Sequence, residues 1–403
     1  MATLTASHQL SARLNALAES ETLAMTKKAR ELAAQGHKVI SLSVGEPDFQ
    51  TPQHIKDAAK KAIDDGFTFY TPVPGYPELR TAIAEKLNKE NGLNFAMENV
   101  VVSTGAKQSI TNVLLSVVGP GDEVIIFAPY WVSYVEMVKL AEGTSVIVKG
   151  GIESDFKVTA KQLEAAITPK TKAILFSSPC NPTGAVFSEK ELRDIAAVVA
   201  KHEKIVVIAD EIYEYINFEG KHFSIGSIPE IADRTVTVNG FSKGYAMTGW
   251  RVGYIGAPKW IAAACDKVQG QVTSGTCSIA QKAALAGLTG DQSFTKEMAK
   301  AYLRRRDLVL AKLKDIPGVK ANLPTGAFYI FPDISYYLGK SFNGNKINTA
   351  ADLAMFLLND AFVACVGGDA FGAPECIRIS YAASDENLIE ATRRIKESLA
   401  KLS

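Results

Sequence analysis

The chain has 403 residues, of which 47% are hydrophobic and 22% charged, and its formal net charge is +1. This composition is typical of a globular protein with room for two or three domains, and the near-neutral charge gives no support to nucleic-acid or anionic-membrane binding. No apolar stretch is long enough to span a bilayer, and residues 1–8 show no secretory signal. We therefore expect a cytoplasmic protein that binds neither nucleic acid nor a membrane.

The cysteines and histidines give no sign of metal chemistry or of a disulfide framework. Five cysteines are present, none in a C-x-x-C pair, and five histidines are scattered without metal-ligand spacing. We expect reduced, mostly buried thiols and no metal site.

The first hundred residues are predicted to be mainly helical. An amphipathic helix is expected over Leu23–Ala34. Thr51 is expected to cap a helix over residues 52–65, which has a proline in its first turn. Another proline opens a helix over residues 77–91.

From residue 100 onward, strands and helices alternate. Short apolar runs predict strands that are buried on both faces of a largely parallel sheet. A helix over about 106–118 follows the first run, and the capping-box pattern at Ser188 opens a helix to about His202. The strand candidates are Val100–Val102, Val124–Phe127, Val146–Val148, Ala173–Phe176, Ile205–Ile208, Thr235–Val238 and Val252–Ile255.

The last third changes character and predicts a smaller unit. Its expected elements are a helix over 292–314, a strand over Phe328–Phe331, a loop over 339–348, a helix over 352–360, a strand over Ile377–Ser380 and a closing helix capped by Ser384. We therefore predict an α/β protein with a large central domain over residues 50–290. A smaller α+β domain is expected from residues 1–49 and 291–403.

The segment Ser242–Arg251, S-K-G-Y-A-M-T-G-W-R, places a lysine just past a buried strand. Most lysines are solvated, but a lysine at a buried strand end must be paired or have a lowered pKa, as a Schiff-base nucleophile needs. Arg251 follows within reach of a phosphate in the same cavity. The glycine spacing comes close to a P-loop, but Trp250 stands where its lysine should be, so nucleoside triphosphate binding is discarded.

Two more strand-end loops carry polar groups. Asp210 ends an apolar strand in A-D-E-I-Y, and Asn181 lies in the turn S-P-C-N-P-T-G. Ligands of open α/β sheets bind at such strand ends. Asp210 could cap a helix or keep a cofactor's ring nitrogen protonated. Asn181 could serve the turn alone or point its amide at a ring oxygen.

Further positions have both a structural and a functional interpretation. Gly105–Lys107 joins a strand to a helix start, where backbone N–H groups could hold a phosphate. Trp131 could stack on a ring or fill the core. Arg378, inside an apolar strand, either faces solvent or clamps a carboxylate. Tyr70 either reaches a phosphate or packs.

Together these motifs resemble the class I/II pyridoxal-phosphate aminotransferases of fold type I, and among them the bacterial aspartate aminotransferases. The likeness extends from Leu42–Phe49 to the Arg378 strand and rests on N-P-T-G, D-E-I-Y and S-K-x-x-A-M-T-G-W-R in this order. It implies pyridoxal 5′-phosphate as cofactor and an obligate homodimer with active sites at the subunit interface.

The resemblance implies a role for each matching residue. Lys243 matches the Schiff-base lysine and proton carrier, Asp210 the partner of the ring nitrogen, and Asn181 with Tyr213 the pair at the ring's phenolic oxygen. The other implied roles are ring stacking by Trp131, a phosphate cradle of Gly105, Ala106, Lys107, Ser242, Arg251 and Tyr70 of the neighbouring subunit, and substrate binding by Arg378, with Gly45, Trp131 and Asn181 beside it.

Two departures from the family bear on the phosphate and on substrate choice. Gly240 stands where animal aspartate aminotransferases have a phosphate-binding serine, so that contact is lost or taken over by Ser242. The arginine that binds the side-chain carboxylate in those enzymes has no clear counterpart in Val268–Thr273. In the bacterial branch a lysine that matches Lys107 does this work, and Ser274 of the other subunit is expected to assist.

The predicted reaction is transfer of the amino group of L-aspartate to 2-oxoglutarate by a ping-pong mechanism. An aromatic or prephenate aminotransferase stays open, since Lys107 could meet either kind of distal carboxylate, and so does a pyridoxal-phosphate-dependent lyase, decarboxylase or synthase of the same fold. A regulator with a retired catalytic domain is disfavoured because every catalytic position is filled. A nicotinamide enzyme is disfavoured because no G-x-G-x-x-G follows a strand.

Overall fold

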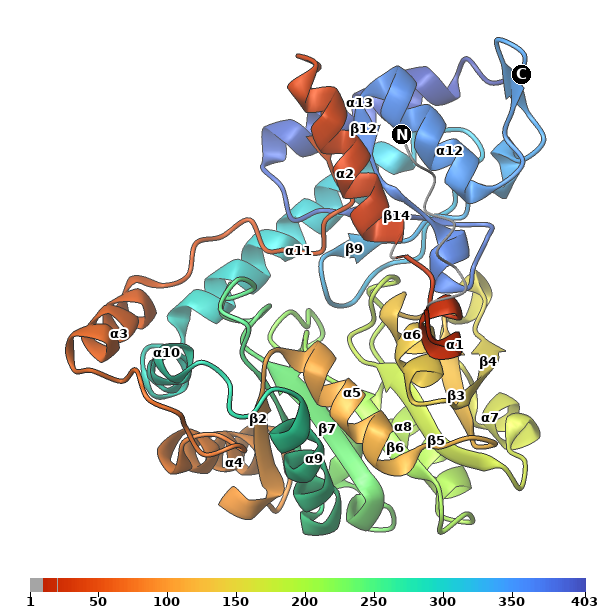
Figure 1. The fold of residues 1–403 in the computed structure, drawn as a ribbon. Coiled ribbons are helices and arrows are strands. Elements are labelled where there is room, and N and C mark those ends of the chain that lie inside the picture. The colour runs from red at the N-terminus through yellow and green to blue at the C-terminus, as the bar shows by residue number, and fades with distance from the viewer. Residues whose placement is uncertain (1–9, 20) are drawn as a thin grey trace.

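A computed structural model describes residues 10–19 and 21–403, so the interpretation of residues 1–8 falls outside the described residues. A sheet in the strand order β2-β8-β7-β6-β5-β3-β4 forms the centre of the larger part (Figure 1). Its strands are β2 (Val100–Ser103), β3 (Glu123–Ala128), β4 (Thr144–Lys149), β5 (Thr171–Ser177), β6 (Val206–Asp210), β7 (Thr235–Gly240) and β8 (Gly253–Gly256).

The sheet is mostly parallel, as the sequence predicts. β8 is antiparallel to both of its neighbours, β2 and β7, whereas the other pairings are parallel. All strands except β8 therefore end at the same edge. The loops that follow these strand ends are the ones that carry the predicted functional motifs.

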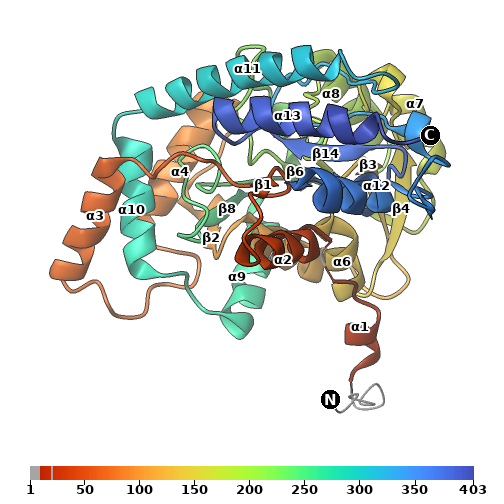
Figure 2. The ribbon, with the colours of Figure 1, turned by 90° about the horizontal axis from the view of Figure 1, so that it is seen from above.

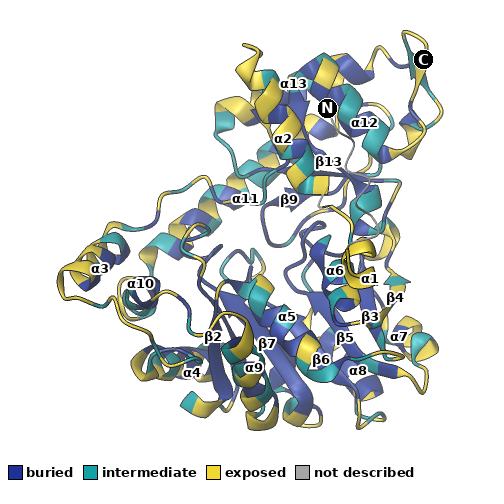
Figure 3. Ribbon diagram, in the orientation of Figure 1, coloured by how far each residue is buried: buried dark blue, intermediate teal, exposed yellow. Residues whose placement is uncertain are grey.

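Helices cover both faces of this sheet. In β3, Val124 and Ile126 belong to one apolar core, and Ile125 and Phe127 belong to another. This alternation explains the continuous apolar run, since both faces are buried (Figure 3). The first core is shared with α5 (Ala106–Val117), α6 (Ser133–Leu140) and α9 (Lys259–Val272), and the second with α7 (Ala160–Ala166) and α8 (Glu189–Val199).

A third apolar core lies at the β2 edge of the sheet, under α3 (Gln53–Asp64), α4 (Pro77–Asn91) and α10 (Ser278–Thr289). The predicted start of the first of these helices is wrong in one detail. Pro52 occupies the N-cap position, and the Thr51 hydroxyl donates a hydrogen bond to the carbonyl of Ala246, at 2.7 Å. A long-range contact has replaced the local cap that the sequence pattern favoured.

Segments from both chain ends share the fourth core. Met25 and Leu42 pack with Tyr302 and Leu388, and Figure 2 shows α2 beside the C-terminal helices. These contacts favour the predicted smaller unit, whose boundaries stay a prediction. Its elements are α2 (Glu21–Ala34), β1 (Ile40–Ser41), α11 (Ser293–Leu313), β9 (Tyr329–Ile330), α12 (Ala350–Phe356), β12 (Val363–Ala364), β13 (Val366–Gly367), β14 (Ile377–Ser380) and α13 (Asp385–Leu399).

The remaining elements are small. α1 covers Ala12–Asn15, and the loop predicted over 339–348 contains a hairpin of β10 (Ser341–Phe342) and β11 (Asn345–Lys346). All five cysteines are free and four of them are buried, as predicted. Within the described ranges, no helix combines the length and apolarity that crossing a membrane requires.

Candidate active site

A cavity of about 440 Å³ lies at the edge where the parallel strands end. A larger hollow of about 620 Å³ adjoins it through Glu46 and Thr248 but is lined by none of the predicted site residues. The smaller cavity is lined by eleven of them: Gly45, Ala106, Lys107, Trp131, Asn181, Asp210, Tyr213, Ser242, Lys243, Arg251 and Arg378. Gly105 directly precedes this set in the chain.

The strand register explains why distant motifs meet. Asp210, the last residue of β6, pairs with Ser177 of β5 and with Val238 of β7. Asn181 follows the end of β5, and Lys243 follows the end of β7. Since these three strands are neighbours and parallel, their following loops converge on one place.

Within the described residues, the hydrogen-bond partners of the buried Asp210 carboxylate are neutral groups. It accepts hydrogen bonds from the Tyr134 hydroxyl, at 2.7 Å, and from the backbone N–H of Ile212, at 3.2 Å. Burial raises the pKa of Asp210 to about 6. Among residues 10–19 and 21–403, no cation forms an ion pair with it, so the carboxylate is suited to a cationic N–H group of a ligand.

Lys243 has the properties of a nucleophilic amine. Its ammonium donates a hydrogen bond to the carbonyl of Gly45. Burial, with the charges of Arg378 and Arg251 adding to it against that of Glu46, lowers the pKa of Lys243 to about 8. A lowered pKa leaves more of the free amine, which is the form that attacks a carbonyl or accepts a proton.

Arg378 lies inside β14 and is buried, so the solvent-facing interpretation is wrong. Its guanidinium donates to the Asn181 amide oxygen, at 3.0 Å, and to the carbonyl of Ser43, at 2.6 Å. It also lies 4.7 Å from the ring centre of Tyr329. Its Nε has no hydrogen-bond partner in the part of the chain that the structure describes. This arrangement is suited to a carboxylate ligand.

Two tyrosines adjoin the arginine. The hydroxyls of Tyr213 and Tyr329 are 2.7 Å apart and share a hydrogen bond. Burial raises the pKa of both side chains, so both stay neutral. Gly45 faces this pair, and a Cβ there would lie 2.5 Å from the Tyr329 hydroxyl oxygen. Glycine at this position therefore keeps the tyrosine pair and the cavity wall in place.

The start of α5 and Arg251 lie together in a way that suits an anion. Gly105 is the N-cap residue with a φ of 83°, and no side chain caps the helix. The first N–H groups are therefore free of a side-chain acceptor and attract negative charge. A Cβ at Gly105 would lie 2.3 Å from the Arg251 guanidinium, so only glycine lets that cation approach.

The structure explains the departure at Gly240. A Cβ at this position would lie 2.9 Å from both the Cα of Gly253 and the carbonyl oxygen of Val252. Because β7 and β8 pack so closely here, a serine side chain has no space. Ser242 lines the cavity two residues later, and its role toward a phosphate stays a prediction.

Lys107 adds a further positive charge to the lining of the cavity. It is exposed, and its ammonium lies 5.0 Å from the ring centre of Trp131. Burial of part of the side chain and the charge of Arg251 lower the pKa of Lys107. Within the described residues, no ion pair involves Lys107, Lys243, Arg251 or Arg378, so anionic ligands can bind all four cations.

Besides Gly105, two predicted site residues do not line this cavity. Tyr70 is fully exposed and Ser274 is exposed. Both were expected to act from a neighbouring subunit, and those roles stay predictions. Conversely, residues of α2 line the cavity although the sequence indicated only an amphipathic helix: Thr22, Leu23, Thr26 and Arg30.

Tyr134 and Tyr329 were also missed by sequence reasoning. Tyr134 follows Trp131 by three residues and lies near the start of α6, where a core role was the ordinary expectation. Tyr329 lies in the apolar strand β9. Neither position has a local sequence signal, because the hydrogen bonds to Asp210 and Tyr213 join residues 76 and 116 positions apart.

Comparison with known proteins identifies the family. Residues 37–395 match the model of aminotransferase class I and II. The chain belongs to this family. The aspartate/prephenate aminotransferase of Cereibacter sphaeroides is 50% identical over 397 residues, which cover 98% of this chain and 99% of that protein.

Solved structures show the same similarity. The crystal structure of the aspartate aminotransferase from Rhizobium meliloti has a TM-score of 0.94 and 43% identity, over 98% of this chain and 100% of that chain. The aspartate aminotransferase from Thermus thermophilus with maleate has a TM-score of 0.91 and 42% identity, over 96% of this chain and 99% of that chain. The predicted fold type is therefore confirmed.

Class I and II aminotransferases use pyridoxal phosphate, and the cavity fits this group. The uncapped start of α5 beside Arg251 suits a phosphate. The buried Asp210 carboxylate suits a protonated ring nitrogen, and Lys243 suits a covalent link to an aldehyde. The relatives named above are aminotransferases, so the lyase alternative finds no support among them.

Replacing Asp210 with Asn should stabilise the cofactor-free enzyme at alkaline pH and abolish turnover. The pKa of Asp210 is about 6 in the folded protein and 3.8 ordinarily, so folding favours the protonated carboxyl. Its contribution to the free energy of unfolding is therefore complete below about pH 3.8 and is lost as the pH rises through 6. The loss reaches roughly 3 kcal/mol, at about 1.36 kcal/mol per pKa unit. Thermal unfolding of both apoenzymes at alkaline and acidic pH measures the effect.

Asp64→Asn, at an exposed position at the end of α3, is the matched control and should change neither curve. If the Asp210→Asn apoenzyme shows the same difference in Tm from the unaltered apoenzyme at both pH values, the carboxylate is not a buried, uncompensated charge.

Proposed function

We propose that this protein is an aspartate aminotransferase that moves the amino group of L-aspartate to 2-oxoglutarate, giving oxaloacetate and L-glutamate. The observation that carries this proposal is the buried Arg378 guanidinium, which has no carboxylate partner among the described residues and shares one cavity with Lys243 and Lys107. Two separate cations beside a reactive amine match a substrate with two carboxylates. The maleate in the Thermus thermophilus structure is also a dicarboxylate.

The cofactor would be held by residues from several loops. Lys243 would bind it covalently, Asp210 would pair with its ring nitrogen, and Trp131 would lie against its ring. Asn181 and Tyr213 would donate to its phenolic oxygen. The phosphate would be bound by Ser242, Arg251 and the backbone of Gly105, Ala106 and Lys107, joined by Tyr70 of a second copy. When bound, the cofactor supplies an electron sink for the bond that breaks at the substrate Cα.

The chain's own residues would orient the substrate and move its proton. Arg378 binds the α-carboxylate through its guanidinium, which Asn181 and the Ser43 carbonyl hold in a fixed orientation. Gly45 leaves space beside this clamp. The Nζ atom of Lys243 then removes the proton from Cα as a general base, and its pKa of about 8 suits that task near neutral pH.

A second activity is favoured by one of the relatives. The Cereibacter sphaeroides protein is an aspartate/prephenate aminotransferase. We propose that Lys107, assisted by Ser274 of a second copy, binds the distal carboxylate of the substrate. Prephenate also carries a distal carboxylate, so the same cation would serve both substrates.

We propose a cytoplasmic homodimer with shared active sites. Support comes from the loop before α4, where Phe69 is 84% exposed and Tyr70 100% exposed. Two neighbouring aromatic side chains in water are a common mark of an interface. The free cysteines suit a reducing compartment.

Lys243→Ala should abolish transamination and the absorbance of the lysine-bound cofactor together, because both need the same Nζ atom. Turnover of aspartate with 2-oxoglutarate and the visible spectrum test this. Lys204→Ala is the control, because Lys204 is exposed and lies just before β6, at the opposite end of that strand from Asp210. It should change neither the turnover nor the spectrum. Normal turnover in Lys243→Ala would disprove the proposed chemistry.

Lys107→Ala should lower kcat/KM for dicarboxylic donors by roughly 10- to 100-fold, the effect of one charge-assisted hydrogen bond. Neutral donors should lose little, because they have no distal carboxylate. A donor panel read at the cofactor absorbance measures this difference. Arg30→Ala is the matched comparison, since Arg30 lines the same cavity. Should Arg30→Ala rather than Lys107→Ala discriminate the donors, the distal carboxylate is bound from α2.

Mixing two variants that are each impaired in one residue of the proposed shared site tests whether the sites are shared. Lys243→Ala removes the nucleophile, and Tyr70→Ala removes the side chain expected to reach the neighbouring phosphate. A hybrid dimer has one site with both residues intact, so its activity should exceed that of either parent. The absence of any gain in verified hybrids would show that Tyr70 does not act across the interface.

A further inference from the structure

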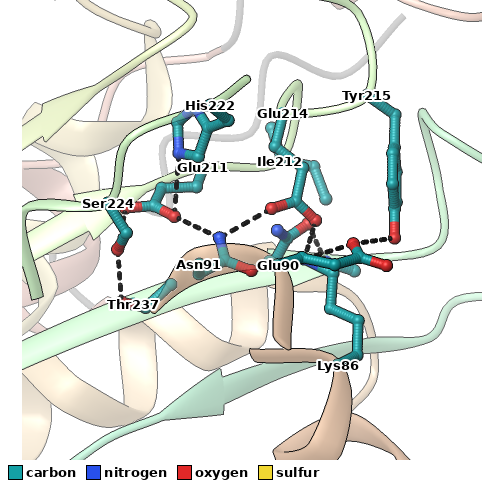
Figure 4. A network of polar contacts seen from close by, with 12 residues as sticks. Lys86, Glu90, Asn91, Glu211, Ile212, Glu214, Tyr215, His222, Ser224 and Thr237 are labelled. Atoms are coloured by element: carbon teal, nitrogen blue, oxygen red, sulfur yellow. Dashed lines mark hydrogen bonds and ion pairs between the residues drawn. The ribbon is translucent and has the colours of Figure 1, made fainter. Parts of the chain in front are cut away.

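A buried polar network lies behind the segment that carries Asp210 and Tyr213 (Figure 4). Those two side chains line the cavity. Glu211 and Glu214, in the same segment, are buried outside the cavity and contact α4. In the short segment 210–214, Asp210 and Tyr213 therefore point to the cavity, whereas Glu211 and Glu214 belong to the buried network.

Side chains of α4 join the two carboxylates. The Asn91 amide nitrogen donates to Glu211, at 3.1 Å, and to Glu214, at 2.8 Å. Lys86 donates to Glu214 and to the Asn91 amide oxygen, the latter at 2.8 Å. On the other side, the Ser224 hydroxyl donates to Glu211, at 2.7 Å. The network therefore spans α4 and the loop after β6.

The charges of this network balance only with a second cation. Lys86 supplies one positive charge against the buried carboxylates of Glu211 and Glu214. Glu90 lies 3.6 Å from the same ammonium but is 42% exposed, so water solvates much of its charge. The imidazole of His222 lies 3.0 Å from Glu211 and is 8% exposed. When protonated, it is the missing cation.

The electrostatic surroundings favour that protonated form. Burial alone lowers the pKa of His222, but the charges of Glu211 and Glu214 outweigh burial and the repulsion by Lys86, so the pKa is raised. Burial acts to raise the pKa of Glu214, but Lys86, His222 and the Asn91 amide together outweigh it, so the pKa of that carboxyl is lowered. Glu211 also acts on Asp210, whose pKa it helps to raise.

A metal ion is a less suitable occupant than a proton. Glu211, Glu214 and His222 each offer a ligand atom within 4.8 Å of the others. The Asn91 amide, however, already bridges the two carboxylates, and the Lys86 ammonium is bonded to one of them. Lys86 would repel a divalent cation more strongly than the single charge of a protonated His222, and a proton on His222 needs no additional space.

We propose that His222 is a positioning residue whose imidazolium, with Lys86, neutralises Glu211 and Glu214 and so holds residues 210–214 where Asp210 and Tyr213 meet the cofactor. Its effect on the cofactor rests on the proposed function, but its protonation does not. An unneutralised buried carboxylate would instead draw water toward the segment and loosen it. Since the folded pKa exceeds the unfolded one, the stabilising effect of His222 is complete below about pH 6.5 and is lost as the pH rises through the folded value.

The protonation of His222 can be measured directly. The measurement is nuclear magnetic resonance of holoenzyme whose histidines carry the heavy nitrogen isotope. The histidine resonance that is missing from the spectrum of His222→Gln belongs to His222. Its titration midpoint should lie above about 6.5, the value of an unfolded histidine. In Glu211→Gln the midpoint should fall below that value, and in Glu219→Gln, an exposed position of the same loop, it should not move. A midpoint below that of an unfolded histidine in the unaltered enzyme overturns the proposal.

The positioning role is tested by the rate at which the holoenzyme loses pyridoxal phosphate on dilution. His222→Gln leaves Glu211 uncompensated, and the loss should become faster by on the order of tenfold. The double variant Glu211→Gln with His222→Gln has a neutral pair that can still form a hydrogen bond, and it should return close to the original rate. A role in packing alone would leave the double variant as impaired as the single one, and that result overturns the proposal.

The two measurements also separate this inference from the proposed function. A protein without transaminase activity could still show the raised His222 midpoint and its fall in Glu211→Gln. Conversely, a normal transaminase in which His222 titrates like an unfolded histidine would disprove only the positioning role.

Discussion

The buried carboxylate of Asp210 is the constraint around which the site is built. It ends β6 in the middle of a parallel sheet, where desolvation disfavours its charge. Its hydrogen-bond partners within the described ranges are two neutral donors, Tyr134 and the Ile212 amide. The carboxylate therefore remains available for a cationic ring nitrogen, and the residues after it must be held rigidly to keep it there.

Rigidity comes from both sides of the segment that follows. Tyr213 is hydrogen-bonded to Tyr329, and Arg378 lies against that second ring. The proposed clamp for the substrate carboxylate and the proposed cofactor site therefore share one packed group of side chains. On the other side, Glu211 and Glu214 are bonded to α4. A shift of the side chains on either side would therefore move Asp210 and Tyr213, because all of them belong to or contact residues 210–214.

Electrostatics gives the cavity its selectivity. Within the described residues, three cations without acidic partners, Lys107, Arg251 and Arg378, share the cavity with the buried carboxylate of Asp210 and the Lys243 amine of lowered pKa. A phosphate and the carboxylates of an amino acid can neutralise these cations, whereas a neutral ligand would leave them desolvated. The family's cofactor and dicarboxylic substrates fit this charge pattern, which explains why Arg378 can be fully buried without an ion pair to any acid of the described residues.

The sequence alone predicted the fold class and the candidate reacting groups, because both leave local signals. Apolar runs that end in polar residues indicated the parallel strands, and A-D-E-I-Y and S-K-G-Y-A-M placed Asp210 and Lys243 at their ends. Only the tertiary structure decided the partners: Thr51 bonds to Ala246 rather than capping its own helix, Tyr134 reaches Asp210, α2 lines the cavity, and Asn91 joins Glu211 to Glu214. These contacts join residues far apart in the chain. Nothing in the local sequence encodes them, because packing of separate elements determines which polar groups meet.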